Sequence, residues 1–235
     1  METNETNKYF LPAAVILAGL FIAGAVMWNG SKPPVAPTGA APAGTAGAPS
    51  ANIKDINTDG DPFIGSANAS VTIAFWSDFQ CPFCKSFELN TFPQIVKEYV
   101  DTGKVKIVMM DFTFLGSDSD TAALYDRSVW KLYPNQYMTW RTAMYEAQDE
   151  EQDIGFGDVA SIDKLNATIA GIDAKKVTAD VKANKSTYQA EVDADKAEAQ
   201  KAGVNATPGF VIGTQVILGA YPYATFKTAI DALLK

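Results

Sequence analysis

The sequence predicts an α/β domain that follows an apolar N-terminal segment and a linker rich in Pro, Ala and Gly. Two observations predict the α/β class. A β-branched and aromatic run, VTIAFW at Val71 to Trp76, precedes a stretch with helical spacing of apolar residues, and a second run, VKIVMM, begins at Val105. Both cysteines of the chain, Cys81 and Cys84, lie between the first run and the helical stretch. The predicted order is strand, Cys-Pro-Phe-Cys, helix, strand.

The N-terminal segment, residues 1–29, contains a candidate membrane anchor. Phe10 to Trp28 carry no charge, and a helix of that length, rising ~1.5 Å per residue, spans roughly the hydrocarbon core of a bilayer. The small-residue triplet Ala23-Gly24-Ala25 leaves a cleavable signal peptide as the alternative. The flanking lysines, Lys8 and Lys32, do not decide the orientation. We expect a retained transmembrane helix.

Residues 30–52 predict a disordered linker, and residues 53–235 predict the folded domain. The linker lacks the large apolar side chains that would offset the entropy lost on ordering. As a flexible coil it would average about 26 Å from end to end. The formal net charge of −8 argues against nucleic acid and anionic lipid surfaces as partners.

Two helical regions follow from residue spacing. The first begins at Pro82, whose missing N–H costs nothing at the first helical position, and is expected to kink at Pro93 and end near Gly103. The second, about residues 117–202, predicts several helices with aromatic residues in their core. Its last helix is predicted to open at a capping box, Ser186 to Gln189, and to end at Gly203.

The cysteine pair has four candidate roles: redox exchange, zinc binding, a structural disulfide, or two buried apolar thiols. Structural zinc needs four Cys or His ligands, and the chain has no histidine and no second cysteine pair. The absence of histidine also excludes Cys-His hydrolase chemistry, and no metal or cofactor site is indicated. A disulfide that closes so short a loop adds little stability. Thiol-disulfide exchange is favoured, with two buried thiols as the alternative.

The placement of the two cysteines predicts different roles for them. Cys81 lies at a helix N-terminus, where backbone N–H groups and the helix dipole favour the thiolate, so it is expected to be the attacking sulfur. Cys84, about one turn inside the helix, is expected to be buried and to resolve the mixed disulfide. Pro82 and Phe83, between them, are expected to tune the redox potential.

The segment Ser77 to Glu88, SDFQCPFCKSFE, resembles the active-site segment of the DsbA-like branch of the thioredoxin superfamily. The resemblance implies a thioredoxin fold with an inserted helical domain. Asn205 to Gly213 is similar to the Thr-Pro loop of that family, which implies that Thr207 and Pro208 bind the client and that Pro208 follows a cis peptide bond. Residues 216–218 and 223–234 would then supply the last strand and the closing helix.

Two departures from the family pattern concern the surroundings of the cysteines. The family commonly has a histidine where this chain has Phe83, and a buried acidic residue at the position of Phe75. Asp78, three residues before Cys81, is the nearest carboxylate that could transfer protons, although a turn residue between strand and helix is the simpler interpretation.

The function predicted is that of a membrane-tethered, extracytoplasmic thiol-disulfide oxidoreductase that donates disulfides to exported proteins. The resemblance implies an N-terminus in the cytoplasm, a catalytic domain outside it, and a membrane quinone-linked oxidant as redox partner. The first alternative is a reductase or isomerase that uses the same site. The second is a peptide-binding module with an inert disulfide on a thioredoxin scaffold.

Overall fold

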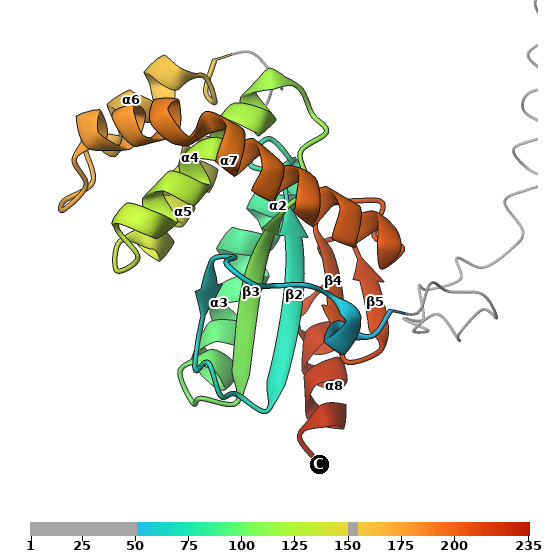
Figure 1. The fold of residues 1–235 in the computed structure, drawn as a ribbon. Coiled ribbons are helices and arrows are strands. Elements are labelled where there is room, and N and C mark those ends of the chain that lie inside the picture. The colour runs from blue at the N-terminus through green and yellow to red at the C-terminus, as the bar shows by residue number, and fades with distance from the viewer. Residues whose placement is uncertain (1–50, 150–154) are drawn as a thin grey trace, which may run out of the picture. The chain divides into compact units, whose positions relative to one another are not determined.

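The computed structural model describes residues 51–149 and 155–235, so the predicted anchor and nearly all of the predicted linker lie outside the described residues. Within the described part, none of the helices combines the length and the apolar character needed to cross a bilayer. The described chain forms one mixed sheet, with helices against both of its faces (Figure 1).

The sheet has five strands in the order β1-β3-β2-β4-β5. The central strands, β2 (Val71–Ser77) and β3 (Val105–Asp111), are parallel, whereas the other three pairings are antiparallel. Six of the seven residues of β2 are buried, because the strand lies between two neighbours and is covered on both faces. The remaining strands are β1 (Phe63–Ile64), β4 (Gly209–Ile212) and β5 (Gln215–Leu218).

The two faces of the sheet are covered by different parts of the chain. One face packs against the helical run that follows the cysteines and against α8 (Tyr223–Leu233). The other face packs against the end of α7 and the short 3-10 helix η1 (Ile53–Asp55), and Figure 1 shows α7 crossing in front of the strands. The predicted strand at Val216 to Leu218 and the closing helix are thereby confirmed.

The helical run after the cysteines is not a uniform α-helix. It consists of α2 (Pro82–Ser86), the π-helical turn η2 (Phe87–Thr91), α3 (Phe92–Ile95) and a second π-helical turn, η3 (Val96–Val100). Pro93 cannot donate a backbone hydrogen bond, and the wide turn η2 ends two residues before it, at Thr91. The sequence predicted the helix and its start but not the π-helical turns.

In the described residues of the insertion between β3 and β4 there are four helices: α4 (Ser117–Leu132), α5 (Tyr137–Ala147), α6 (Val159–Asn166) and α7 (Ala174–Lys201). The predicted capping box at Ser186 is wrong, because it lies in the middle of α7. The side chain of Asp173 caps this helix by accepting a hydrogen bond from the Lys176 N–H at 3.1 Å. No Gly or Pro interrupts the following 28 residues. The helix ends, as predicted, just before Gly203, whose φ is 72°.

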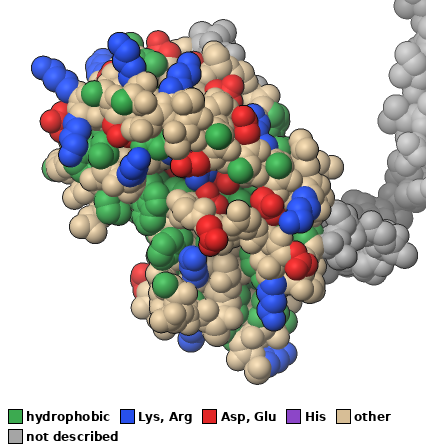
Figure 2. Space-filling view, in the orientation of Figure 1, with side chains coloured by type: hydrophobic (Ala, Val, Ile, Leu, Met, Phe, Trp, Pro, Cys, Tyr) green, Lys and Arg blue, Asp and Glu red, His purple; other side chains and the backbone are tan. Residues whose placement is uncertain are grey.

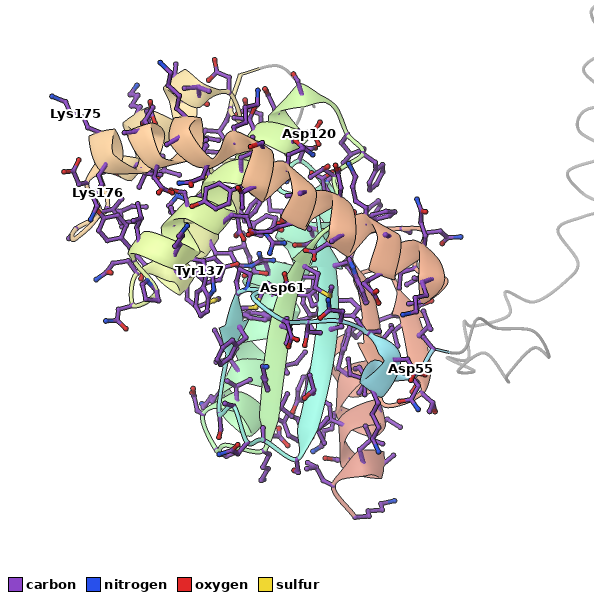
Figure 3. All side chains as sticks on the ribbon, viewed as in Figure 1. Asp55, Asp61, Asp120, Tyr137, Lys175 and Lys176 are labelled. Atoms are coloured by element: carbon purple, nitrogen blue, oxygen red, sulfur yellow. The ribbon has the colours of Figure 1, made fainter. Side chains whose placement is uncertain are left out.

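A buried charge cluster joins the insertion to the sheet. Arg127 on α4 donates hydrogen bonds to Asp61 at 2.6 Å, to Asp111 of β3 at 3.0 Å and to Asp195 of α7. Its four members are nearly inaccessible to solvent, although acidic side chains gather on the surface beside them (Figure 2). Figure 3 labels Asp61 close to the point where α7 crosses the sheet. One guanidinium therefore holds three elements together.

Candidate active site

The cysteines lie where β2 ends and the helical run begins. Cys81 is the N-cap of α2, with extended backbone angles, and Pro82 occupies the first helical turn, as predicted. The Cys81 N–H donates to the Asp78 carbonyl at 3.1 Å, which closes the turn between strand and helix. Both cysteines are free thiols.

The environment of Cys81 favours its thiolate. Its pKa is lowered to about 6, chiefly by a hydrogen bond with the Cys84 thiol, and burial opposes this shift. The Thr207 side chain and the backbone N–H groups at the start of α2 lower it further. The Cys81 thiol also lies 3.4 Å from the Thr207 carbonyl, to which it donates when protonated.

The pKa of Cys84 is shifted in the opposite direction from that of Cys81. It is completely buried, and burial raises its pKa well above the usual range of a thiol. A negative charge on Cys81 raises that pKa again. At neutral pH the pair therefore carries one thiolate, on Cys81, and one proton, on Cys84.

Thr207 and Pro208 lie beside the pair, in the loop that leads into β4. The Thr207–Pro208 peptide bond is cis, as the resemblance implied. The Pro208 carbonyl accepts a hydrogen bond from the Gly219 N–H at 2.7 Å, which ties this loop to the end of β5. The Thr207 hydroxyl is buried and lacks a hydrogen-bond partner within the described part of the chain, so it is available to an ionised Cys81.

Asp78 is buried beneath the loop before Cys81. Its carboxylate accepts hydrogen bonds from the Gln80 N–H at 2.8 Å, the Ser119 hydroxyl at 2.7 Å and the Phe114 N–H at 3.1 Å. Burial raises its pKa, whereas these donors oppose the rise. A carboxylate engaged by three donors fixes the loop conformation, and this arrangement favours the structural interpretation of Asp78 over proton transfer.

Gln148, which follows α5, links the insertion to the cysteine loop. Its side-chain Nε2 donates to the backbone carbonyls of Phe79 at 2.7 Å and Cys81 at 3.1 Å. The backbone carbonyl of Gln148 accepts a hydrogen bond from Lys85 Nζ at 2.8 Å. The role of Gln148 was not predicted from the sequence. Its only signal was its position after a predicted aromatic helix, which does not predict a contact 67 residues away.

A second buried charge pair, also missed, lies behind the cysteines. Arg141 of α5 donates to Glu88 Oε1 at 3.0 Å and to the Ser77 hydroxyl at 2.9 Å. Its guanidinium also lies 5.3 Å from the ring centres of Phe75 and Phe79. Glu88 stands among the apolar residues of a helix face, and this was the sequence signal that could have identified it.

Phe83 and Phe75 occupy the two positions where the sequence departs from the family pattern. Phe83 is 66% exposed and carries no hydrogen-bonding group. Phe75 is fully buried in β2 and stacks on Phe210 with ring centres 4.7 Å apart. Strand β2 therefore has an aromatic side chain, and no carboxylate, at the position where the family commonly has a buried acidic residue.

Comparisons with known proteins agree with this geometry. A family model described as Thioredoxin matches residues 57–232. Disulfide bond formation protein D of Bacillus subtilis is 32% identical over 178 residues, which cover 75% of this chain and 78% of that protein. A probable disulfide bond formation protein D of Bacillus anthracis is 24% identical over 172 residues, covering 73% of this chain and 77% of that protein.

Solved structures show the same architecture. The oxidised form of BdbD from Bacillus subtilis superposes with a TM-score of 0.69 at 27% identity and covers 76% of this chain and 95% of its own. DsbA of Chlamydia trachomatis, at 21% identity, shares the fold with a TM-score of 0.65, covering 82% of this chain and 97% of its own. The chain therefore belongs to the thioredoxin family and, within it, to the DsbA-like protein thiol-disulfide oxidoreductases.

Proposed function

We propose that this protein is a membrane-tethered, extracytoplasmic oxidase that donates disulfides to exported proteins. A client thiolate attacks Cys81 in the Cys81–Cys84 disulfide, and Cys84 leaves and takes up a proton. A second client thiolate attacks the client sulfur of the mixed disulfide, which forms the client disulfide and releases Cys81 as a thiolate. Two electrons pass from client to enzyme in each cycle.

The observation that carries this proposal is the difference between the two sulfurs. Cys81 has a pKa of about 6, whereas Cys84 is buried and remains protonated. An ionised Cys81 stabilises the reduced form, and a shift from 9.0 to about 6 is worth roughly 1–2 kcal/mol near neutral pH, or ~20–45 mV in potential. Because the ionised Cys81 stabilises the reduced enzyme, this shift favours reduction of the enzyme and oxidation of the client.

The surroundings of Cys81 support an unfolded polypeptide as the client. Phe83 and Phe114 are both more than half exposed, and the Phe114 N–H is bound to Asp78 beneath the cysteine loop. Thr207 and Pro208 lie in the loop beside the sulfur, with the Thr207 carbonyl 3.4 Å from the Cys81 thiol. Apolar side chains with adjacent backbone groups are suited to an extended client segment whose side chains vary.

The family supports the proposed redox partner and location. DsbA-like proteins generally act on substrate thiols and are reoxidised by a membrane partner, and we infer a quinone-linked oxidant for this chain. Residues 53–235 would lie outside the cytoplasm as the catalytic domain. The linker at 30–52 and the anchor at 1–29 would keep that domain near the oxidant.

The proposed membrane anchor can be tested by separating membranes from soluble protein. We expect the full-length protein to sediment with membranes and to resist carbonate extraction, because Phe10 to Trp28 are long and apolar enough to span a bilayer. A protein that begins near Ala51 should stay in solution and retain its redox activity. Release of a processed protein cleaved after Ala25 would contradict the retained anchor.

The effect of Phe83 on the reduction potential can be tested by substitution. Phe83→His should lower the Cys81 pKa below about 6 and raise the reduction potential by roughly 20–45 mV, because a protonated imidazole beside the sulfur adds about 1–2 kcal/mol to thiolate stability. Thiolate absorbance against pH reports the first change, and equilibration with glutathione reports the second. A potential that stays constant or falls would show that the backbone N–H groups of α2 dominate.

A client-oxidation assay tests the proposed function. The oxidised protein should form disulfides in a reduced, unfolded protein substrate at stoichiometric amounts, and the Cys81→Ser variant should not. A protein that instead reduces insulin disulfides and fails to oxidise thiols would be a reductase. One that does neither would be a binding module.

A further inference from the structure

The backbone of Cys81 is held by hydrogen bonds on both sides of the residue. Its N–H donates to the Asp78 carbonyl at 3.1 Å, and its carbonyl accepts from the Lys85 N–H, also at 3.1 Å, in the first turn of α2. The side chain of Gln148 donates a second hydrogen bond to the same carbonyl, at 3.1 Å. The first two bonds are local, whereas the bond from Gln148 fixes Cys81 relative to the insertion.

Gln148 reaches the cysteine loop because α5 packs against that loop. The ring of Phe79 contacts Trp140 and Tyr145 of α5, with ring centres 5.4 and 5.0 Å apart. Gln148 follows Tyr145 by three residues and ends the helix, so its side chain projects from the same side of α5. There its Nε2 lies 2.7 Å from the Phe79 carbonyl and 3.1 Å from that of Cys81. The two N–H groups of one amide thus serve the two carbonyls.

The burial of the Gln148 amide points to a role beyond stability. Carbonyl groups only accept hydrogen bonds, so the nitrogen of Gln148 must face Phe79 and Cys81. The oxygen, Oε1, is then buried without a hydrogen-bond partner in the part of the chain that the structure describes. A buried acceptor without a partner costs free energy, which an apolar side chain at this position would avoid.

The carbonyl of Cys81 is linked to its sulfur through the start of α2. The backbone N–H groups of Phe83 and Cys84 contribute to the low pKa of Cys81, and they do so only while they face the sulfur. The ψ angle of Cys81 is 117°. A rotation about that bond turns the carbonyl away from Gln148 and moves the N–H groups of α2 relative to the sulfur. The hydrogen bond from Gln148 opposes this rotation.

We infer that Gln148 is a positioning residue for Cys81, which holds the Cys81 carbonyl so that the sulfur continues to face the N–H groups at the start of α2. Gln148 acts through the backbone, and Cys81 remains the reacting residue. The insertion thereby contributes to the reduction potential of the cysteine pair. This role rests on the proposed function, in which Cys81 is the attacking sulfur.

The substitution Gln148→Met in the purified full-length protein tests this role. Methionine has a similar length but no hydrogen-bond donor, and Lys85 binds the backbone carbonyl at this position, so its charge stays in place. The Cys81 pKa should rise from about 6 by roughly half a unit to one unit, the worth of one hydrogen bond. At pH 7 the equilibrium with glutathione should then shift by about 3- to 5-fold towards the disulfide, or ~15–20 mV towards lower potential. Thiolate absorbance against pH reports the first change.

The matched control is Gln80→Met. Gln80 is buried like Gln148, and its Nε2 donates at 3.1 Å to the Phe156 carbonyl, so it joins the cysteine loop to the insertion in the opposite direction. Its loss removes a hydrogen bond between the same two parts of the chain but leaves the Cys81 carbonyl engaged. Urea unfolding should show a lower midpoint for both variants. The Cys81 pKa and the potential should stay at their native values in Gln80→Met alone.

Gln148→Asn provides a second variant of the same residue. It keeps an amide but is one methylene shorter, so its nitrogen falls short of the two carbonyls, and the pKa and potential should shift in the same direction as in Gln148→Met. Native values in the folded Gln148 variants, or an equal shift in Gln80→Met, would overturn the inference. These results are differences between variants and do not depend on the native potential, which tests the proposed oxidase separately.

Discussion

Replacing Cys84 with Ser should convert the protein from a catalyst into a trap. Cys81 can still form a mixed disulfide, but no second enzyme thiol is present to resolve it, so turnover should fall by at least about 100-fold. Covalent adducts with exported proteins should accumulate and disappear on treatment with dithiothreitol. Gel electrophoresis without reductant, followed by identification of the bound proteins, measures this directly.

The matched control is Cys81→Ser. This variant keeps Cys84, but that thiol is fully buried and has a raised pKa, so it should form few adducts. Both variants lose the same disulfide, and only the accessibility and pKa of the remaining sulfur differ between them. More adducts with Cys81→Ser than with Cys84→Ser would reverse the assignment of the two roles.

Arg127→Leu should strongly destabilise the fold. Removing the guanidinium leaves Asp61, Asp111 and Asp195 without their shared cation in a buried site. Breaking a buried ion pair from one side typically costs about 3–5 kcal/mol. Urea unfolding followed by circular dichroism should show a lower midpoint with a similar slope.

The control is Lys196→Met, which alters the residue next to Asp195 on α7. Lys196 lies 3.7 Å from Asp120, and both side chains are partly exposed, so its loss should change the unfolding midpoint little. Equal effects of the two substitutions would show that the buried cluster does not hold the insertion to the sheet.

The sequence predicted those parts of the fold that depend on local patterns. Strand β2 and the start of α2 were predicted from a β-branched run and from Pro82 at the first helical position, and both are confirmed. The last helix of the insertion was placed too late, because Ser186 fits a capping box and yet lies inside a long helix. Local capping chemistry could not outweigh the high helix propensity on both sides of Ser186.

The parts of the site that were not predicted depend on contacts distant in sequence. Gln148 meets the cysteine loop through a contact that spans 67 residues, and Glu88 and Arg141 are 53 residues apart. A charged residue within an apolar helix face signals burial, but the sequence does not name its partner. The difference between the two sulfurs comes from the hydrogen bond that lowers the Cys81 pKa and from the burial that raises the Cys84 pKa, and only the assembled fold provides both.

The reduction potential of the Cys81/Cys84 couple is the most direct test of the proposal that the protein is an oxidase. Equilibration of the purified protein with reduced and oxidised glutathione, with the two forms separated after acid quenching, gives this value. The low pKa of Cys81 stabilises the reduced form and predicts a potential more oxidising than the ≈ −270 mV of thioredoxin. A potential near or below that of thioredoxin would contradict the proposal and identify the protein as a reductant.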